Sequence, residues 1–314
     1  MPSVHCPSCH SSRCVSVGPI PDNCRFAGAV LPEALPGGVL YRCETCALWF
    51  RFPRLPKEVV ARLYENGSSE VWSAPAAQRN DWTLVEDCLK AFVPSGRVLD
   101  VGCFDGALLA RLSSAYLPYG VELNRHAAER ARQRGVTVLR HDFDDLGHCA
   151  ERFNAIIATD VVEHTGDPLR FLRDCANLLL PGGVMIITTG TTDAWSWGLM
   201  GGRYWYCANP EHLSFLNEAW VQNASAQLSL QTLRVVRFAH DASLRLSAMQ
   251  MLLNLSYWAF PRMFAAAKRV FARGPSTRKR PELGRLPPSW STASDHLLVA
   301  LRASGYPGRA WNAK

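Results

Sequence analysis

The chain lacks the segments that are typical of a secretory signal or of a membrane-spanning helix. Its first residues do not join a basic stretch to an apolar run, so we expect no secretory signal. One long run without a charged residue lies between Arg245 and Arg262 and is 16 residues long, and Gln250 and Asn254 interrupt it. A helix that spans a bilayer needs about 20 apolar residues. We therefore expect a cytoplasmic protein, with peripheral contact to the inner membrane face as an option.

The chain also lacks an excess of positive charge, except in the segment 262–285. Its 34 Lys and Arg residues against 27 Asp and Glu residues give a net charge of +7. Residues 262–285 alone contain eight basic residues and a single acidic one, Glu282, so the remainder of the 314 residues is formally neutral. An anionic partner would be attracted to this segment. Because the N-terminal region is not basic, a nucleic-acid partner is not expected.

Cysteine, by contrast, is abundant, with 11 residues. Without a secretory signal, metal binding or buried thiols are better interpretations than a disulfide framework. Cys6-x-x-Cys9 and Cys43-x-x-Cys46 are separated by 33 residues, and two such pairs can supply four thiolates to a structural zinc ion. Other residues could replace one of these four ligands, and free thiols are the alternative to a zinc site. The possible replacements are Cys14, Cys24, His5 and His10. We predict a zinc-ribbon lobe over residues 1–53.

The most informative stretch runs from Val98 to Leu112 and is typical of a strand, a glycine-bearing turn and a helix. This arrangement directs backbone N–H groups and a helix N-terminus at a ligand. Glu122 ends a second strand about 20 residues later, where a Rossmann-like domain holds a ribose. Short apolar runs predict further strands of a parallel sheet covered on both faces. The predicted strands are 97–101, 118–122, 136–140, 154–159, 183–189, 229–238 and 296–302, and the predicted helices are 106–114, 125–134 and 167–179, with another from Asn217.

These motifs resemble those of class I S-adenosylmethionine-dependent methyltransferases over residues 95–239. Asp100-x-Gly102-x-Phe104-x-Gly106 resembles motif I, and Leu180-Pro-Gly-Gly183 resembles the turn before the fifth strand. The resemblance implies an α/β, Rossmann-like, mostly parallel seven-stranded sheet beside the small zinc-ribbon lobe. It implies that S-adenosyl-L-methionine is bound by Asp100, Gly102, Cys103, Phe104, Gly106, Glu122, Leu123, Asp142, Phe143 and Asp160.

Phe104 departs from this pattern, because glycine is commonest at its position and permits close backbone approach. Its ring must point away from the ligand or pack on the ligand's edge. A nicotinamide dinucleotide is a poorer match, since its fingerprint would require glycine at both Phe104 and Ala107.

Two histidines are candidates for a general base. Asp160-Val-Val-Glu163-His164 resembles the segment of ubiquinone-pathway O-methyltransferases in which acidic and His residues can hold a divalent cation. A cation at Asp160, Glu163 and His164 is therefore one prediction, and a structural role is the alternative. His212 lies in an aromatic segment, 202–215, that resembles the lid of bacterial methyltransferases with an N-terminal zinc ribbon. We predict that His164 or His212 accepts a proton from a hydroxyl acceptor.

The remaining segments complete the predicted organisation: a helical linker at 54–94, the cofactor domain at 95–240, an apolar–basic insertion at 241–293 and a last strand and tail at 294–314. Apolar residues followed by basic ones in 244–285 suit either peripheral contact with an anionic membrane or a helix pair packed on the fold. The oligomeric state is not predicted.

The predicted function is methyl transfer, at oxygen, to a small-molecule acceptor. Sugar or polysaccharide precursors, aromatic hydroxyls and lipid-linked molecules are the expected acceptors. One alternative is a zinc-containing ribosomal-RNA methyltransferase, although the chain has no Asn/Asp-Pro-Pro-aromatic motif after the fourth strand. Another is a non-catalytic scaffold. Fold alone does not decide between them.

Overall fold

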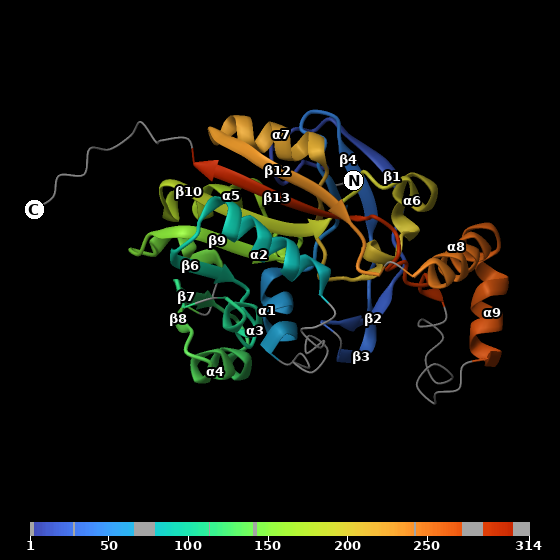
Figure 1. Ribbon diagram of the computed structural model, residues 1–314. Helices are drawn as coiled ribbons and strands as arrows, with labels where there is room; N and C mark the ends of the chain where they lie inside the picture. Colours follow the sequence, from blue (N-terminus) through green and yellow to red (C-terminus); the bar gives the residue numbers. More distant parts are fainter. Residues whose placement is uncertain are drawn as a thin grey trace, which may run out of the picture.

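A seven-stranded sheet forms the centre of the protein in the computed structural model (Figure 1). The structure describes residues 3–27, 29–65, 79–112, 114–140, 143–241, 243–271 and 285–303. Only β13 is antiparallel to its neighbours, β10 and β12, and the other strand pairs are parallel. The sheet is therefore the predicted Rossmann-like one. In spatial order its strands are β12 (Leu230–Phe238), β13 (His296–Ala303), β10 (Leu179–Gly190), β9 (Phe153–Thr159), β6 (Gly96–Val101), β7 (Tyr116–Val121) and β8 (Thr137–Arg140).

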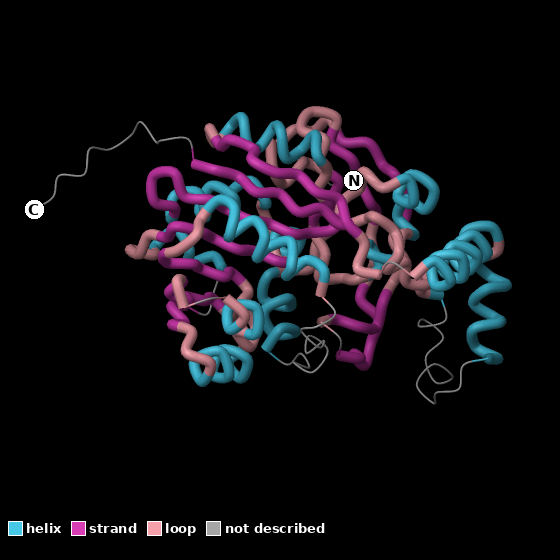
Figure 2. Tube along the Cα trace, viewed as in Figure 1, coloured by secondary structure: helices cyan, strands magenta, loops and turns pink. Residues whose placement is uncertain are grey.

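Helices cover both faces of this sheet (Figure 2). One apolar core contains side chains of α5 (Pro168–Leu178) and α7 (Glu218–Gln227), such as Leu172 and Trp220. A second core, on the other side, contains side chains of α2 (Asn80–Phe92), α3 (Ala107–Ala110) and α4 (Arg125–Gln133), such as Val85 and Leu108. Burial on both faces explains why the central strands are continuous apolar runs.

The starts of the helices follow from their capping residues. The side chain of Asn217 accepts a hydrogen bond from the backbone N–H of Trp220 at 2.8 Å, and Asn124 and Asp167 cap α4 and α5 in the same way. The predicted start of a helix at Asn217 is confirmed. α3 is shorter than the predicted helix over 106–114, because the N–H groups of Arg111 and Leu112 bond three residues back and end it.

The cysteine-rich N-terminal lobe is built on a second sheet with the order β1 (Cys14–Pro19), β4 (Val39–Cys43), β5 (Trp49–Phe52) and β11 (Ser214–Phe215). β2 (Asn23–Phe26) and β3 (Ala29–Leu35) form a separate antiparallel pair. The last strand of the lobe's sheet, β11, comes from the segment that follows β10. The lobe is thus joined to the cofactor domain through a shared sheet, and α1 (Lys57–Glu65) follows it in the chain.

The apolar–basic insertion between β12 and β13 forms a helical hairpin. α8 (Leu244–Ala259) and α9 (Pro261–Phe271) meet at Pro261, and they project from the body of the protein (Figure 1). Proline begins α9 because its missing N–H needs no partner at the first helical position. Within the described part of the chain, no helix combines the length and apolar character that crossing a bilayer requires.

Candidate active site

The carboxyl ends of the parallel strands place three predicted acidic residues at one edge of the sheet. Asp100 is near the end of β6, Glu122 directly follows β7 and Asp160 directly follows β9. Glu122 closes the two adjoining turns, because its carboxylate accepts hydrogen bonds from the backbone N–H groups of Phe104 at 2.8 Å and Asn124 at 2.7 Å. Ligands bind at this edge in open α/β sheets. The predicted cofactor residues therefore occupy the expected place.

The glycine-bearing turn depends on left-handed backbone conformations. Gly102, Phe104 and Gly106 have φ values of 78°, 47° and 76°. A Cβ atom at Gly106 would lie 2.9 Å from Cγ2 of Val136, so glycine is also required there by close packing. The ring of Phe104 lies beneath the guanidinium of Arg130, and the distance from Cζ of Arg130 to the ring centroid is 5.4 Å. Phe104 therefore adopts the turn conformation and directs its ring toward α4.

Cys103 and Leu123 complete the described part of the predicted cofactor set. Cys103 is buried, and a Cβ atom on Gly120 would approach its Sγ to 2.4 Å, so the thiol fills the space that this glycine leaves. Leu123 is half-buried beside Glu122. Asp142 lies outside the described residues, and only the backbone of Phe143, which begins the short helix η3 (Phe143–His148), is described.

The carboxyl group of Asp100 is held in an unusual electrostatic state. Burial, helped by the nearby charge of Glu122 and opposed by Arg79, raises the pKa of Asp100 to about 8. Its Oδ1 atom is buried without a hydrogen-bond partner among the described residues. A buried acceptor without a partner is unfavourable unless a ligand supplies a donor or a positive charge. The site thus fits a cationic ligand such as the predicted S-adenosylmethionine.

Asp160 has a different partner from the one the sequence suggests. Its Oδ2 lies 3.0 Å from Nη2 of Arg79, and the same guanidinium binds the buried Asp81 with a 2.7 Å contact. The predicted cation set of Asp160, Glu163 and His164 is wrong in this respect. The groups that converge within 4.8 Å of one another are Glu163, His164 and His212. The backbone of Asp160 explains the difference, since its φ of 52° turns the chain between β9 and the short helix η4 (Val162–His164).

Glu163 is buried and already has hydrogen-bond donors on both carboxylate oxygens. The hydroxyl of Tyr206 donates to Oε1 at 2.5 Å, and that of Thr189 donates to Oε2 at 2.9 Å. Burial raises the pKa of Glu163 to about 7, and the charge of Asp160 acts in the same direction. A cation at this cluster would have to compete with both hydroxyl donors. The contacts therefore favour a structural role in which Glu163 ties β10 to the aromatic segment.

The structure brings His164 and His212 together, with ring centroids 4.9 Å apart. Nδ1 of His164 lies 3.0 Å from the hydroxyl of Tyr64 and 3.1 Å from the carbonyl of Glu211. Nδ1 of His212 donates to the carbonyl of Tyr206 at 2.9 Å. Burial lowers the pKa of both imidazoles, and for His212 the neighbouring His164 lowers it further. Both rings are therefore neutral at neutral pH and are held by backbone carbonyls.

The aromatic segment around His212 is fixed in place by the N-terminal lobe. Arg51 of β5 is buried and donates to the carbonyls of His212 at 3.1 Å, Asn209 at 2.9 Å, Gly37 and Cys207. Burying a guanidinium is unfavourable unless its donors are satisfied, and these carbonyls satisfy them. The lid, which we define as residues 201–213, therefore depends on the lobe for its conformation.

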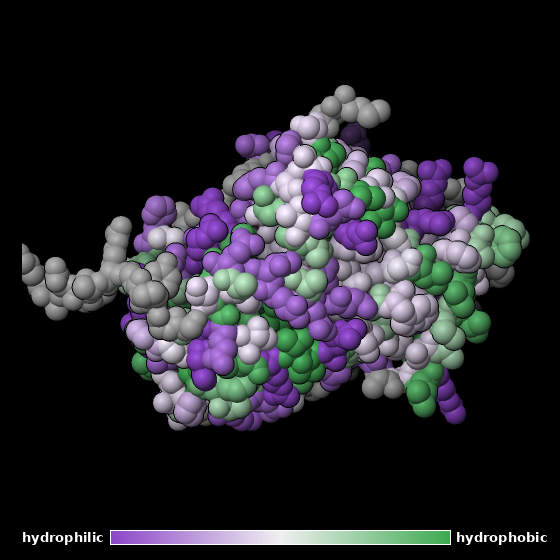
Figure 3. Space-filling view, turned by 90° about the horizontal axis from the view of Figure 1, so that it is seen from above, coloured by the Kyte–Doolittle hydropathy of each residue, from purple (hydrophilic) through white to green (hydrophobic). Residues whose placement is uncertain are grey.

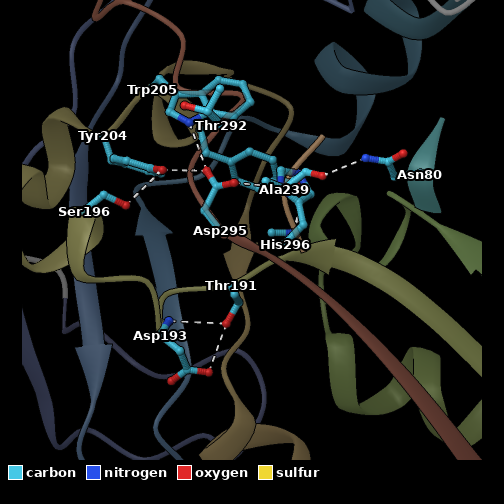
Figure 4. Close-up of polar contacts among 12 residues, drawn as sticks. Asn80, Thr191, Asp193, Ser196, Tyr204, Trp205, Ala239, Thr292, Asp295 and His296 are labelled. Atoms are coloured by element: carbon cyan, nitrogen blue, oxygen red, sulfur yellow. Dashed lines mark hydrogen bonds and ion pairs between the residues drawn. The ribbon is translucent and has the colours of Figure 1, made fainter. Parts of the chain in front are cut away.

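Sequence reasoning missed an acid–histidine pair at the start of β13 (Figure 4). Oδ1 of Asp295 lies 2.8 Å from Nδ1 of His296. The other carboxylate oxygen accepts hydrogen bonds from the hydroxyl of Tyr204 at 2.5 Å and from the indole N–H of Trp205 at 3.0 Å. Asp295 is thereby held from two sides and fixes the orientation of the imidazole.

His296 lies at the same sheet edge as the acidic residues. In the register of the sheet it is opposite Gly190 and Phe238, the last residues of β10 and β12. The ring of His240 is 4.0 Å away between centroids. Although burial opposes protonation, the hydrogen bond and charge of Asp295 raise the pKa of His296, and Asp160 and Glu163 add to the effect. The signal for this pair was present, because an antiparallel last strand must begin at this edge.

The four predicted zinc ligands are also brought together. Sγ of Cys6 lies 3.5 Å from that of Cys46, and Sγ of Cys9 lies 3.5 Å from that of Cys43. All four sulfur atoms lie within 4.8 Å of one another. A tetrahedral zinc ion with four thiolates requires sulfur atoms about 3.8 Å apart. The cysteine cluster therefore fits zinc.

Comparison with known proteins adds independent information. A methyltransferase-domain family model matches residues 77–231. Residues of the chain are 34% identical over 119 positions to a ubiquinone biosynthesis O-methyltransferase from Parvibaculum lavamentivorans, covering 34% of this chain and 46% of that protein. A protein with the same name from Xanthomonas campestris pv. campestris is 32% identical over 184 residues, which cover 50% of this chain and 75% of the relative. The chain thus spans about half the length of the first relative.

Among solved structures, the protein is similar to an S-adenosylmethionine-dependent methyltransferase from Thermotoga maritima. The TM-score is 0.47 and the identity is 16%, over 78% of this chain and 99% of the other.

Proposed function

The chain belongs to the class I S-adenosylmethionine-dependent methyltransferases, and from this we propose that it transfers a methyl group to an oxygen atom of a small or lipid-linked acceptor. One observation carries the proposal: a cofactor-type acidic pair and an oriented acid–histidine pair meet at the same sheet edge. The acidic pair is Asp100 and Glu122, and the second pair is Asp295 and His296. Relatives named ubiquinone biosynthesis O-methyltransferases support oxygen as the accepting atom.

The cofactor, when bound, supplies a methyl group on a sulfonium centre, which is a reactive electrophile. Asp100 and Glu122 would hold it, because carboxylates at the ends of β6 and β7 accept hydrogen bonds and attract a positive charge. The protein's remaining task is to orient the acceptor in line with the methyl group and to exclude water.

A hydroxyl acceptor must lose a proton during the reaction, and we assign that proton to Nε2 of His296. Nδ1 donates to Asp295, so Nε2 is the free basic nitrogen, and no described residue bonds to it. His164 and His212 stay predictions for the same role. Their lowered pKa values make them weaker bases than His296, whose pKa is raised.

For the acceptor we propose an aromatic hydroxyl, a sugar or polysaccharide precursor, or a lipid-linked molecule. In the lid, Trp205 is only partly buried and packs on the buried ring of Tyr206, so its indole suits contact with a planar or sugar-like ligand. Neither an RNA methyltransferase nor a non-catalytic scaffold is favoured by the relatives found.

We also propose that the cysteine cluster holds a structural zinc ion. Four protein ligands leave no open position for a substrate, so the ion would stabilise the lobe and, through Arg51, the lid.

The test is a transfer assay with cofactor labelled in its methyl group. Purified, zinc-replete protein is incubated with catechol, with a hexose and with an isoprenoid-linked phenol, and labelled product is separated from unreacted cofactor. Label in an ether linkage to one of these acceptors supports the proposal. If the protein binds the cofactor but transfers no label to any of the three, the proposed acceptor classes are wrong. If it does not bind the cofactor, the proposed activity fails.

A further inference from the structure

The helix α8 has its polar side chains on the inside. Gln250, Asn254 and Tyr257, at helical spacings of four and three, are the buried residues of this helix. The amide of Gln250 donates to Ser291 at 3.0 Å and accepts from the backbone N–H of Thr292 at 3.1 Å. These bonds attach α8 to the segment that leads into β13. An ordinary surface helix buries its apolar stripe instead.

The opposite face of α8, and the start of α9, present large apolar side chains to solvent. In the described part of the chain, nine of the fourteen exposed large apolar residues lie on this hairpin. The exposed fractions of Leu244, Met263 and Leu252 are 87%, 70% and 63%. In the space-filling view, green side chains gather at the end of the protein formed by the hairpin (Figure 3). The nine are Leu244, Met249, Met251, Leu252, Leu253, Leu255, Trp258, Phe260 and Met263.

Such a surface requires an apolar partner. A concentrated exposed apolar patch marks a protein or membrane contact, whereas scattered apolar residues do not. The other five exposed large apolar residues are Val15, Val30, Leu117, Trp195 and Val235, which lie on separate elements.

Charge identifies the partner. Residues 243–271 contain four basic residues and no Asp or Glu. Arg245 on α8 and Arg262 on α9 are both exposed beside the apolar patch. An open cavity of about 450 Å³ lies where Pro21, Tyr257 and Ala265 meet, and the side chains of Arg262 and Arg285 line it. Apolar side chains next to cations match the surface of an anionic bilayer, with acyl chains beneath phosphate groups. Two copies of the hairpin would instead bring like charges together.

We propose that the α8–α9 hairpin docks the protein onto an anionic lipid bilayer, with its apolar face in the interfacial region. The hairpin leaves the core beside His240 and His296, where the backbone N–H of Asp241 bonds to the carbonyl of Ser291 at 3.1 Å. The docked surface would therefore lie on the side of the sheet edge that carries the candidate active site.

The test is co-sedimentation of the full-length, zinc-replete protein with vesicles. Wild type is expected to bind phosphatidylcholine vesicles that contain phosphatidylglycerol, and to bind pure phosphatidylcholine vesicles far less. The variant Leu252→Glu places a charge on the apolar face and should weaken binding by at least about tenfold. Leu117→Glu is the matched control, since Leu117 is 57% exposed but lies on β7, and this variant should bind as wild type does.

Three results would overturn the proposal. Wild type could fail to bind the anionic vesicles at low salt, or Leu252→Glu could bind them as tightly as wild type does. The third result is a wild-type dimer in solution that Leu252→Glu dissociates, without any binding to vesicles. Melting temperatures of both variants show that the substituted proteins are folded.

Discussion

The cofactor half and the acceptor half of the sheet edge are built in different ways. The centre of the cofactor half comes from one continuous segment, residues 96–124, in which β6, a turn and β7 place Asp100 and Glu122 on neighbouring strands. The acceptor half is assembled from four distant segments, each of which supplies one histidine: His164, His212, His240 and His296. A locally built site can fold and bind by itself, whereas an assembled one depends on every element that positions it.

The largest expected effect comes from removing zinc. Cys43→Ser, or treatment with a chelator, should abolish transfer, because β5 and Arg51 would no longer hold the lid. It should also lower the melting temperature by several degrees. Metal content, turnover and melting temperature are measured on the same preparation. Ser11→Ala is the control, because Ser11 lies in the same lobe but is not one of the four cysteine ligands, and it is less buried than Ser8. Unchanged metal content and turnover in Cys43→Ser would contradict the account.

The same contrast explains what the sequence could predict. Motifs within about 30 residues, such as the Asp100 turn, Glu122 and the paired cysteines, follow from local spacing and were found. The pairing of Asp295 with Tyr204 and Trp205 joins positions some 90 residues apart and has no local pattern. The ion pair between Arg79 and Asp160 also joins residues far apart in the sequence. Because Asp160 binds Arg79, it does not lie with Glu163 and His164 in the predicted cation set.

The sequence also left open which face of the insertion is buried. Composition predicted an apolar–basic insertion at 241–293 that could form a helix pair. Which side is buried depends on Gln250 and Asn254 finding partners in residues 289–292, and that contact is visible only in the fold.

The second effect tests the acceptor half alone. His296→Asn should reduce the rate constant of transfer by about hundredfold or more, because the proton acceptor is lost. Affinity for the cofactor should not change. In wild type, activity should rise with pH across a pKa above 6.5, since only the neutral imidazole accepts a proton and its pKa is raised. Asp295→Asn should move that midpoint to lower pH, and the exposed His126→Asn, on α4, is the control.

If His164→Asn or His212→Asn lowers the rate of transfer while His296→Asn is fully active, the proton acceptor is one of the two histidines predicted from the sequence.

The third effect tests the cofactor half. Glu122→Gln should weaken cofactor binding by about ten- to hundredfold, the size of one or two hydrogen bonds to a charged group. The Glu122 carboxylate also accepts hydrogen bonds from the backbone N–H groups of Phe104 and Asn124, so the turn should be less rigid in the variant. Equilibrium dialysis measures the affinity. Glu129→Gln, on the exposed face of α4, provides the matched control, and equal losses in both variants would exclude a specific role.

The smallest effect concerns stability. The pKa of Asp100 in the folded protein, about 8, is above its value near 3.8 in the unfolded chain. The folded state therefore binds more protons between these values, and stability falls as pH rises from about 4 to about 8. Asp100→Asn removes the charge and should gain on the order of 2 kcal/mol at pH 8, with little gain near pH 4. Denaturant unfolding of the cofactor-free protein at both pH values measures the gain in the free energy of unfolding. A gain that does not depend on pH would show that the charge of Asp100 is not its cause.

The most direct test of separate halves is calorimetric titration of S-adenosylmethionine into zinc-replete wild type and into folded Cys43→Ser protein. We expect one-to-one binding with similar affinity in both, because the acidic pair Asp100 and Glu122 and the glycine-bearing turn lie within residues 96–124, outside the cysteine lobe. Failure of well-folded wild type to bind, or loss of binding together with zinc, would contradict it.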